Sequence, residues 1–259
     1  MKRLFALLVL MVPATLFAQS VFNGTWRVDP QSWQYIGHET FSLRKGTYQC
    51  SSCVPKIEVK ADGQDHKVSG SPYFDTVNVR EVNDHTVEIV NKKGAKPSGT
   101  TKATASEDGK TLTNEFTFVT EGGQNGSGKY TSERVGVAPE GDANKISGEW
   151  QPGRIENASE NMLMLTYKVT DDGLSMSDQT GDSYTAKFDG KDYPYKGDPG
   201  TTSVSLKKID ANTIEETDKR NGKVISVIRM AVAPDGKTLS ANIEDKLGGR
   251  AFKWTAEKQ

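Results

Sequence analysis

The sequence Gly24-Thr25-Trp26 returns as Gly148-Glu149-Trp150, about 124 positions later. A second pair of matching stretches, Asp108-Gly109-Lys110-Thr111-Leu112 and Asp235-Gly236-Lys237-Thr238-Leu239, is offset by about 127 positions. A repeat of this length divides a chain of 259 residues into two units of ordinary domain size. The sequence therefore predicts two tandem copies of one fold.

The ends of the copies fix their expected boundaries. Lys129-Tyr130-Thr131 near the end of the first copy matches Lys253-Trp254-Thr255 near the end of the second. We expect the first copy at residues 21–137, a linker at 138–147 and the second copy at 148–259. The small difference in offset belongs in surface loops, which accept length changes at little free-energy cost.

The apolar residues occur in short alternating runs. Hydrophobic residues make up 34% of the chain, and runs such as Val77-Asn78-Val79, Phe116-Thr117-Phe118 and Val204-Ser205-Leu206 have the period of two that is typical of strands. Asp-Gly and Asn-Asp pairs between the runs favour tight turns. After the first 20 residues no long helical period is found, so the chain is predicted to be all-β.

Each copy contains about eight candidate strands at the spacing of a meander. Sequential antiparallel strands leave two exposed edges, and pairing the last strand with the first removes both. We therefore expect two tandem antiparallel meander β-barrels of about eight strands each. The interior of such a barrel is either filled by side chains or holds one small ligand.

The Gly-x-Trp motifs give the chain a resemblance to lipocalin-like (calycin) proteins, whose first strand carries this motif. Here Gly24-Thr25-Trp26 and Gly148-Glu149-Trp150 each open a copy. The resemblance implies that the two Trp side chains close the base of a barrel and pack against a basic residue of the last strand. Arg134 and Lys258, at aligned positions near the ends of the two copies, are the candidates for that residue. These four residues have an expected structural role.

The first residues have the pattern of a secretory signal peptide. Lys2 and Arg3 precede an apolar run at residues 4–12, which is too short for a permanent membrane span, and small residues follow. We expect a signal peptide at residues 1–18, with cleavage possible after residue 20. No Cys lies at that junction, so no lipid anchor is expected, and the predicted location is secreted or periplasmic without a membrane-spanning segment.

The two cysteines form the motif Cys50-Ser51-Ser52-Cys53, which in a secreted chain is most simply a disulfide. Redox chemistry and metal binding are the alternatives, but a strand-like run follows the motif instead of the helix that a redox pair needs. His38, His66 and His85 lack the short spacing of a zinc site. No metal and no cofactor are predicted.

Two acidic motifs occupy matching places in the copies: Asp62-Gly63-Gln64-Asp65 and Asp189-Gly190-Lys191-Asp192. A hairpin turn is favoured over a calcium loop, since the full ligand pattern of a calcium loop is absent. The formal net charge of -1 provides no general attraction to nucleic acid.

No catalytic motif is recognised, so an enzyme is not predicted, and it stays a third alternative that would require a cleft with convergent acids or histidines. The resemblance implies a carrier of a small apolar or amphipathic molecule, and the alternative is a filled-barrel envelope module that contacts a polymer or another protein. A cavity of roughly 300 Å³ or more would favour the carrier. The aromatic residues near strand ends that are expected to line a mouth are Trp33, Tyr35, Tyr73 and Phe74 in the first copy and Tyr193 and Tyr195 in the second, with a ligand in one or both barrels.

Overall fold

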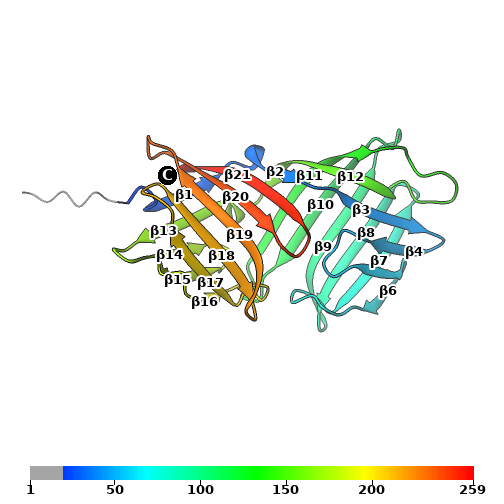
Figure 1. Ribbon diagram of the computed structural model, residues 1–259. Helices are drawn as coiled ribbons and strands as arrows, with labels where there is room; N and C mark the ends of the chain where they lie inside the picture. Colours follow the sequence, from blue (N-terminus) through cyan, green and yellow to red (C-terminus); the bar gives the residue numbers. More distant parts are fainter. Residues whose placement is uncertain (1–19) are drawn as a thin grey trace, which may run out of the picture.

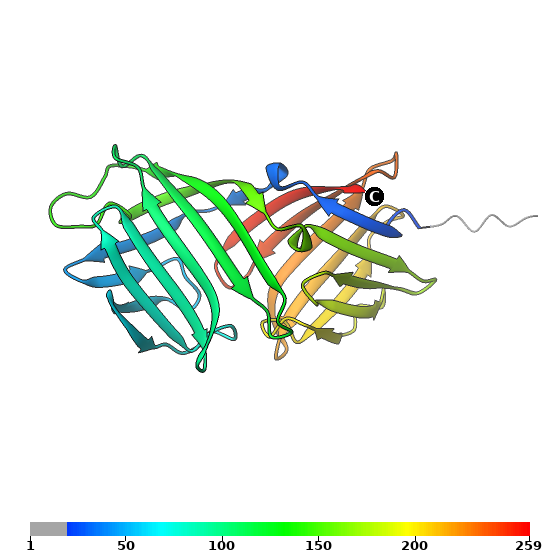
Figure 2. The same cartoon turned by 180° about the vertical axis from the view of Figure 1, so that it is seen from behind.

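The computed structural model describes residues 20–259, and the expected signal peptide at residues 1–18 lies outside them. The described residues form strands β1 to β21 and two 3-10 helices of three residues each, η1 (Pro30–Ser32) and η2 (Glu160–Met162). Figures 1 and 2 show two antiparallel barrel-like sheets side by side. The predicted all-β class with two barrels is confirmed.

The first barrel is a sheet of ten strands in the order β5-β4-β3-β12-β11-β10-β9-β8-β7-β6. Its two outermost strands are not paired with each other, so it is nearly closed. The strands are β3 (Glu39–Arg44), β4 (Thr47–Cys50), β5 (Ile57–Lys60), β6 (Asp62–Lys67), β7 (Thr76–Asn83), β8 (Thr86–Lys93), β9 (Lys96–Ala105), β10 (Thr111–Val119), β11 (Asn125–Val135) and β12 (Gly148–Ala158).

The second barrel is closed, because β1 pairs with both β13 and β21. Strand β2 extends the sheet along β21, beyond β1. The strands are β1 (Gly24–Val28), β2 (Gln34–Ile36), β13 (Met164–Val169), β14 (Gly173–Asp178), β15 (Ser183–Lys187), β16 (Tyr193–Lys196), β17 (Ser203–Lys208), β18 (Thr213–Arg220), β19 (Lys223–Val232), β20 (Thr238–Asp245) and β21 (Arg250–Lys258).

The first barrel contains two strands more than the sequence pattern indicated. Strand β4 is only four residues long, and β6 contains no apolar residue. Strand β4 alternates polar and apolar residues but is too short to stand out, and β6 lacks the alternating pattern altogether. Pairing with β3 and β5, and with β7, holds them in the sheet instead.

The two barrels exchange their first strands. Strand β1 opens the first copy of the repeat, yet Trp26 lies opposite Leu165 and Lys258 in the second barrel. Strand β12 opens the second copy, yet Trp150 lies opposite Arg134 and Glu39 in the first. Figure 1 shows β1 beside β13 and β12 beside β11.

This exchange corrects the expected boundaries at residues 137 and 148. The first barrel is the continuous segment 39–158, whereas the second combines residues 24–36 with 164–258. Because β12 follows β11 directly in the chain, antiparallel pairing of the two is the more local arrangement. Strand β1 then completes the second barrel.

The segment expected as a linker, residues 138–147, belongs to the first barrel. Ile146 is 2% exposed and packs in its core, and Asn144 is 3% exposed. The Asn144 amide donates to Oε1 of Glu81 and to the carbonyl of Asn83, both at 2.7 Å. The segment therefore closes one end of the first barrel.

Candidate functional site

The closed base of each barrel is built on a Trp side chain with no solvent exposure. The Trp150 indole donates from Nε1 to the carbonyl of Ile146 at 2.8 Å, and the guanidinium carbon of Arg134 lies 4.0 Å from the ring centroid. In the second barrel Trp26 donates to the carbonyl of Phe22 at 2.9 Å, and Nζ of Lys258 lies 5.1 Å from its ring. Each Trp therefore contacts the cation from the end of the other copy.

The glycine of each motif is required by this contact. Gly24 and Gly148 have φ values of +126° and +136°, a region that side chains rarely adopt. A Cβ atom at Gly148 would lie 2.2 Å from Nη1 of Arg134, and one at Gly24 would lie 2.9 Å from Cε of Lys258. Glycine lets the cation approach the indole face. The Gly-x-Trp motifs thus serve closure of the base.

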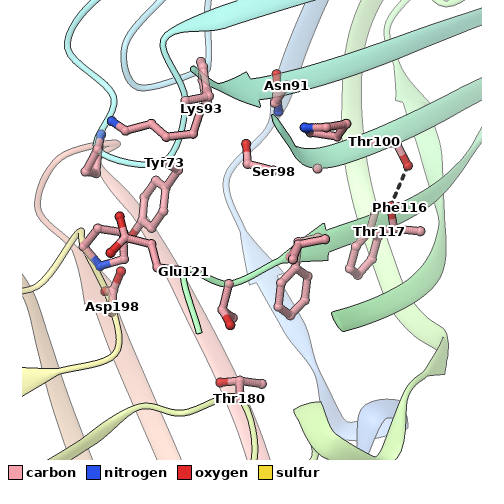
Figure 3. Close-up of a pocket in the computed structure, with 18 of the residues that line it drawn as sticks. Tyr73, Asn91, Lys93, Ser98, Thr100, Phe116, Thr117, Glu121, Thr180 and Asp198 are labelled. Atoms are coloured by element: carbon pink, nitrogen blue, oxygen red, sulfur yellow. Dashed lines mark hydrogen bonds between the residues drawn. The ribbon is translucent and has the colours of Figure 1, made fainter. Parts of the chain in front are cut away.

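The opposite end of the first barrel holds the largest cavity described, of about 880 Å³. Figure 3 shows its wall, formed by strands β8 to β10 and the loops beside them. Phe116 and Phe118 of β10 and Phe74 of the loop before β7 supply apolar surface, and residues 197–199 of the second barrel form the far wall. Drug-sized ligands occupy cavities of roughly 300–1,000 Å³.

Two glycines on β11 make room for the aromatic rings of this wall. Phe116 pairs with Gly128, and Phe118 pairs with Gly126. A Cβ atom on either glycine would lie within 2.4 Å of the facing ring. The rings therefore lie flat against the neighbouring strand, and the space in front of them stays open. The run Phe116-Thr117-Phe118 was predicted as a strand, but its place in a cavity wall was not. The glycines of Gly126-Ser127-Gly128 on the facing strand were the sequence signal for it.

A smaller chamber of about 160 Å³ lies within the first barrel. Asn91, Thr101 and Tyr130 line both this inner chamber and the larger mouth cavity, so the two spaces adjoin. Asn114, which is 2% exposed, also lines the chamber. Its Nδ2 and the Oδ1 of Asn91 are buried polar atoms without a hydrogen-bond partner. These polar residues went unnoticed in the sequence, because isolated Asn residues on strands give no signal.

One carboxyl group lies beside the chamber. Tyr130 donates its hydroxyl to the carboxylate oxygens of Glu39 at 3.2 and 3.3 Å. Burial raises the pKa of Glu39, although Tyr130 and Arg250 act in the opposite direction. Burial, followed by the neighbouring Glu39, also raises the pKa of Tyr130 well above its ordinary value. This part of the barrel therefore disfavours charge.

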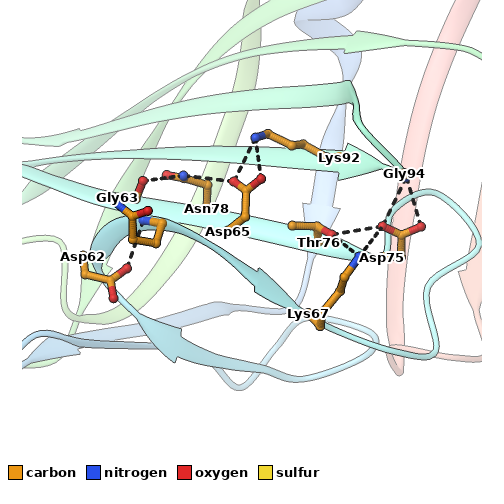
Figure 4. Close-up of polar contacts among 10 residues, drawn as sticks. Asp62, Gly63, Asp65, Lys67, Asp75, Thr76, Asn78, Lys92 and Gly94 are labelled. Atoms are coloured by element: carbon orange, nitrogen blue, oxygen red, sulfur yellow. Dashed lines mark hydrogen bonds and ion pairs between the residues drawn. The ribbon is translucent and has the colours of Figure 1, made fainter.

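Salt bridges hold the rim of the mouth cavity in place. Figure 4 shows the Asp65 carboxylate held by Nζ of Lys92, at 2.7 and 2.8 Å, and by the Asn78 amide at 3.2 Å. The backbone N–H of Gly94 donates to the Asp75 carboxylate at 3.1 and 3.2 Å. The Asp65 contacts join β6 to β7 and β8, and the Asp75 contact attaches the loop before β7 to the β8–β9 turn; this loop and the flanks of this turn line the mouth.

The acidic motif at residues 62–65 is a β-bulge instead of the expected hairpin turn. Gly63 has a φ of +74°, and the register between β6 and β7 shifts between Asp62 and Asp65. The matching Asp189 does cap a turn, accepting from the backbone of Lys191 at 3.0 Å. In the first copy the carboxylates are bonded to protein donors, which leaves the calcium alternative without support.

The second barrel contributes acidic groups to the far wall of the mouth. Burial, with Asp178 and Asp198 nearby, raises the pKa of Asp182 to about 7. Tyr73 reaches across from the first barrel, so that a Cβ atom on Gly200 would lie 1.9 Å from its hydroxyl oxygen. Burial, followed by Asp198, raises the pKa of Tyr73.

The four aromatic residues expected at the mouth of the first copy do not gather at one site. Tyr73 and Phe74 line the mouth cavity of the first barrel. Trp33 and Tyr35 instead pack on Phe252 of the second barrel, with ring centroids 5.8 and 5.1 Å apart. The two expected in the second copy are partly buried against the core of the second barrel: Tyr193 and Tyr195. Exchange of the first strands explains the separation, because it carries residues 24–36 away from the rest of their copy.

The interior of the second barrel contains a buried polar network. Tyr184 donates its hydroxyl to Glu216, and Ser226 donates to Asp218 at 2.7 Å. Burial, followed by the neighbouring Asp218, raises the pKa of Glu216 well above its ordinary value. Oδ1 of Asp218 is buried in this network without a hydrogen-bond partner.

Cys50 and Cys53 form the expected disulfide, with Cα atoms 5.4 Å apart. The three histidines pair with surface carboxylates instead of with one another: His38 with Glu149, His66 with Asp62, and His85 with Asp84 and Glu107. Within residues 20–259, no group of three or more His, Cys, Asp or Glu side chains is placed to hold a metal ion.

Comparison with known proteins gives no identification: no protein-family model matches the chain, and no curated protein matches it. In the described part of the chain, no helix has the length and apolar character needed to cross a membrane.

Proposed function

We propose that this protein binds a small amphipathic molecule in the first barrel. The observation that carries the proposal is the cavity of about 880 Å³ at the barrel mouth, which adjoins the inner chamber of about 160 Å³. Its volume exceeds the roughly 300 Å³ that separates a ligand site from a packed core. Apolar rings at the mouth and unpartnered amides inside it match a molecule with an apolar body and a polar end.

The arrangement of the barrels agrees with a lipocalin-like carrier. Each base is closed by a Trp side chain and a cation, whereas the far end of the first barrel is open. A site with one entrance lets a ligand bury most of its surface. We further propose that the protein is exported as a secreted or periplasmic carrier, on the basis of the pattern at residues 1–18.

The second barrel fits the alternative of a filled module. Its interior holds Tyr184, Glu216 and Asp218, joined by hydrogen bonds and close packing. The first barrel then binds the ligand, and the second barrel supports the mouth through residues 197–199.

The proposal is tested by titrating the purified protein with N-phenyl-1-naphthylamine, a neutral apolar dye that fluoresces in dry cavities. The wild type is expected to bind one dye per chain. In Thr101→Trp an indole fills the junction of the two cavities, and at least a tenfold weaker affinity is expected. Thr104→Trp is the matched control, because Thr104 is a partly exposed threonine of the same strand and lines none of the cavities described.

Equal binding by the wild type and Thr101→Trp would place the dye elsewhere and overturn the proposal. Native mass spectrometry of the protein purified from its own host provides the second readout. A bound small molecule that is present in the wild type and absent in Thr101→Trp supports the carrier function.

A further inference from the structure

We infer that the ligand of the first barrel enters with a neutral head group that both donates and accepts hydrogen bonds, such as an alcohol or a carboxamide, and places it between Asn91 and Asn114. This inference rests on the proposed function and names the chemical class of its ligand. The apolar body of the molecule remains in the mouth cavity.

The first observation is the state of the two amides. Asn114 and Asn91 both line the inner chamber, and Nδ2 of Asn114 and Oδ1 of Asn91 are buried without a hydrogen-bond partner in the protein. Leaving a buried polar atom unsatisfied costs roughly 1–3 kcal/mol, so such atoms are uncommon in folded proteins. A bound hydroxyl or amide removes that penalty, by accepting from Asn114 and donating to Asn91.

The orientation of the two amides sets this requirement. A carboxamide carries two donors on nitrogen and an acceptor oxygen. In the structure the unpartnered atoms are one donor, Nδ2 of Asn114, and one acceptor, Oδ1 of Asn91. In this orientation a pure acceptor, such as an ether, would leave Asn91 without a partner, and a pure donor would leave Asn114 without one. A head group with both functions satisfies both amides and remains suitable if either amide rotates.

The second observation concerns charge. None of the residues that line the inner chamber has a charged side chain. Glu39, which bonds to the lining residue Tyr130, has a raised pKa because it is buried, and its carboxylate oxygens already accept from Tyr130. An ionic head group would lose its hydration without gaining a counter-charge, which is strongly unfavourable.

The third observation is the size of the chamber. An apolar cavity of about 150 Å³ in another protein accommodates benzene, so a chamber of about 160 Å³ holds a head group of similar size and not a whole drug-sized molecule. The remaining part of the ligand must lie among Phe74, Phe116 and Phe118 in the mouth. The shape of the site therefore separates the head from the body.

The test compares four probes that carry a straight ten-carbon chain and differ in the head group: decan-1-ol, decanamide, decanoate and decyltrimethylammonium. Each competes with N-phenyl-1-naphthylamine at pH 8. The alcohol and the amide are expected to displace the dye at about tenfold lower concentration than the two ions. Asn114→Leu, which is nearly isosteric, is expected to weaken the alcohol and the amide by about fivefold to tenfold and to leave the ions unchanged.

The outcomes separate this inference from the proposed function. If the dye itself does not bind, the proposed function fails. If the dye binds and all four probes displace it alike, only the head-group inference fails. The same conclusion follows if Asn114→Leu retains the preference of the wild type.

Folding of the variant is controlled independently. Because the Asn114 amide has no partner in the free protein, Asn114→Leu is expected to melt at the wild-type temperature or above. If it does not fold, Asn91→Leu repeats the measurement from the other side of the chamber, with the same expected loss and the same contrary result.

Discussion

Replacing Trp26 by Ala tests which barrel the first strand belongs to. Trp26 has no solvent exposure, donates to the carbonyl of Phe22 and lies beneath Lys258 of the second barrel. It belongs to the first copy of the repeat but to the second barrel. The substitution is therefore expected to loosen residues 164–258 and to leave residues 39–158 unchanged.

The expected loss is large. Trp→Ala at a fully buried site typically costs about 3–5 kcal/mol, which includes the cavity that remains. A domain of this kind has a total stability of roughly 5–15 kcal/mol. Opening of the second barrel thus becomes roughly a hundred to several thousand times more frequent, since each 1.4 kcal/mol is a factor of ten.

Hydrogen exchange followed by mass spectrometry resolves the two barrels by their peptides. In Trp26→Ala the amides of β13 to β21 are expected to exchange faster, whereas those of β3 to β11 keep the wild-type rate. Trp150→Ala is the matched variant, with the opposite expectation, because Trp150 has the same burial and lies beneath Arg134. Faster exchange of β3 to β11 in Trp26→Ala would show that each strand stays with its own copy, and would refute the exchange.

Two further predictions concern the base and the second barrel. Gly148→Ala places a side chain at φ +136° and displaces Arg134. A loss of about 1–3 kcal/mol in the free energy of unfolding is therefore expected, measured by urea titration. A loss below about 0.5 kcal/mol would contradict the role given to this glycine. Glu216 has a raised pKa in the folded state, so its contribution to stability is present at low pH and is lost as the pH rises through that pKa. Glu216→Gln is therefore expected to exceed the wild type in stability at pH 8 by about 1–2 kcal/mol and to lose this advantage at pH 4, whereas a pH-independent difference would contradict the assignment.

The sequence predicted the fold where local pattern determines it. Alternating runs such as Phe116-Thr117-Phe118 became strands, and the two Gly-x-Trp motifs became equivalent parts of two barrels. The exchange of β1 and β12 was not predictable from the repeat. The two motifs are similar, so the repeat alone does not indicate which barrel each strand joins.

The site was predictable only in part, because the sequence does not give the strand register. Tyr73 and Phe74 were found because aromatic residues in a polar loop are conspicuous. Asn91 and Asn114 were missed because a polar residue at an inward strand position is visible only when the strand register is known. The register places Asn114 opposite Ala103 and Tyr130, inside the barrel.

The two copies of the repeat differ in the side chains that point into their barrels. The two copies share their register, since Val87 pairs with Ala103 as Ile214 pairs with Met230. At equivalent places in this register, Gly128 of the first barrel corresponds to the larger Phe252 of the second, and Thr101 corresponds to Ile228. Ile89 corresponds to Glu216, and Asn91 corresponds to Asp218; both acids are hydrogen-bonded. The base retains a Trp and a cation in both. The difference between the copies is therefore concentrated on the inward positions around the mouth, where the volume and polarity of a few side chains decide between a cavity and a packed core.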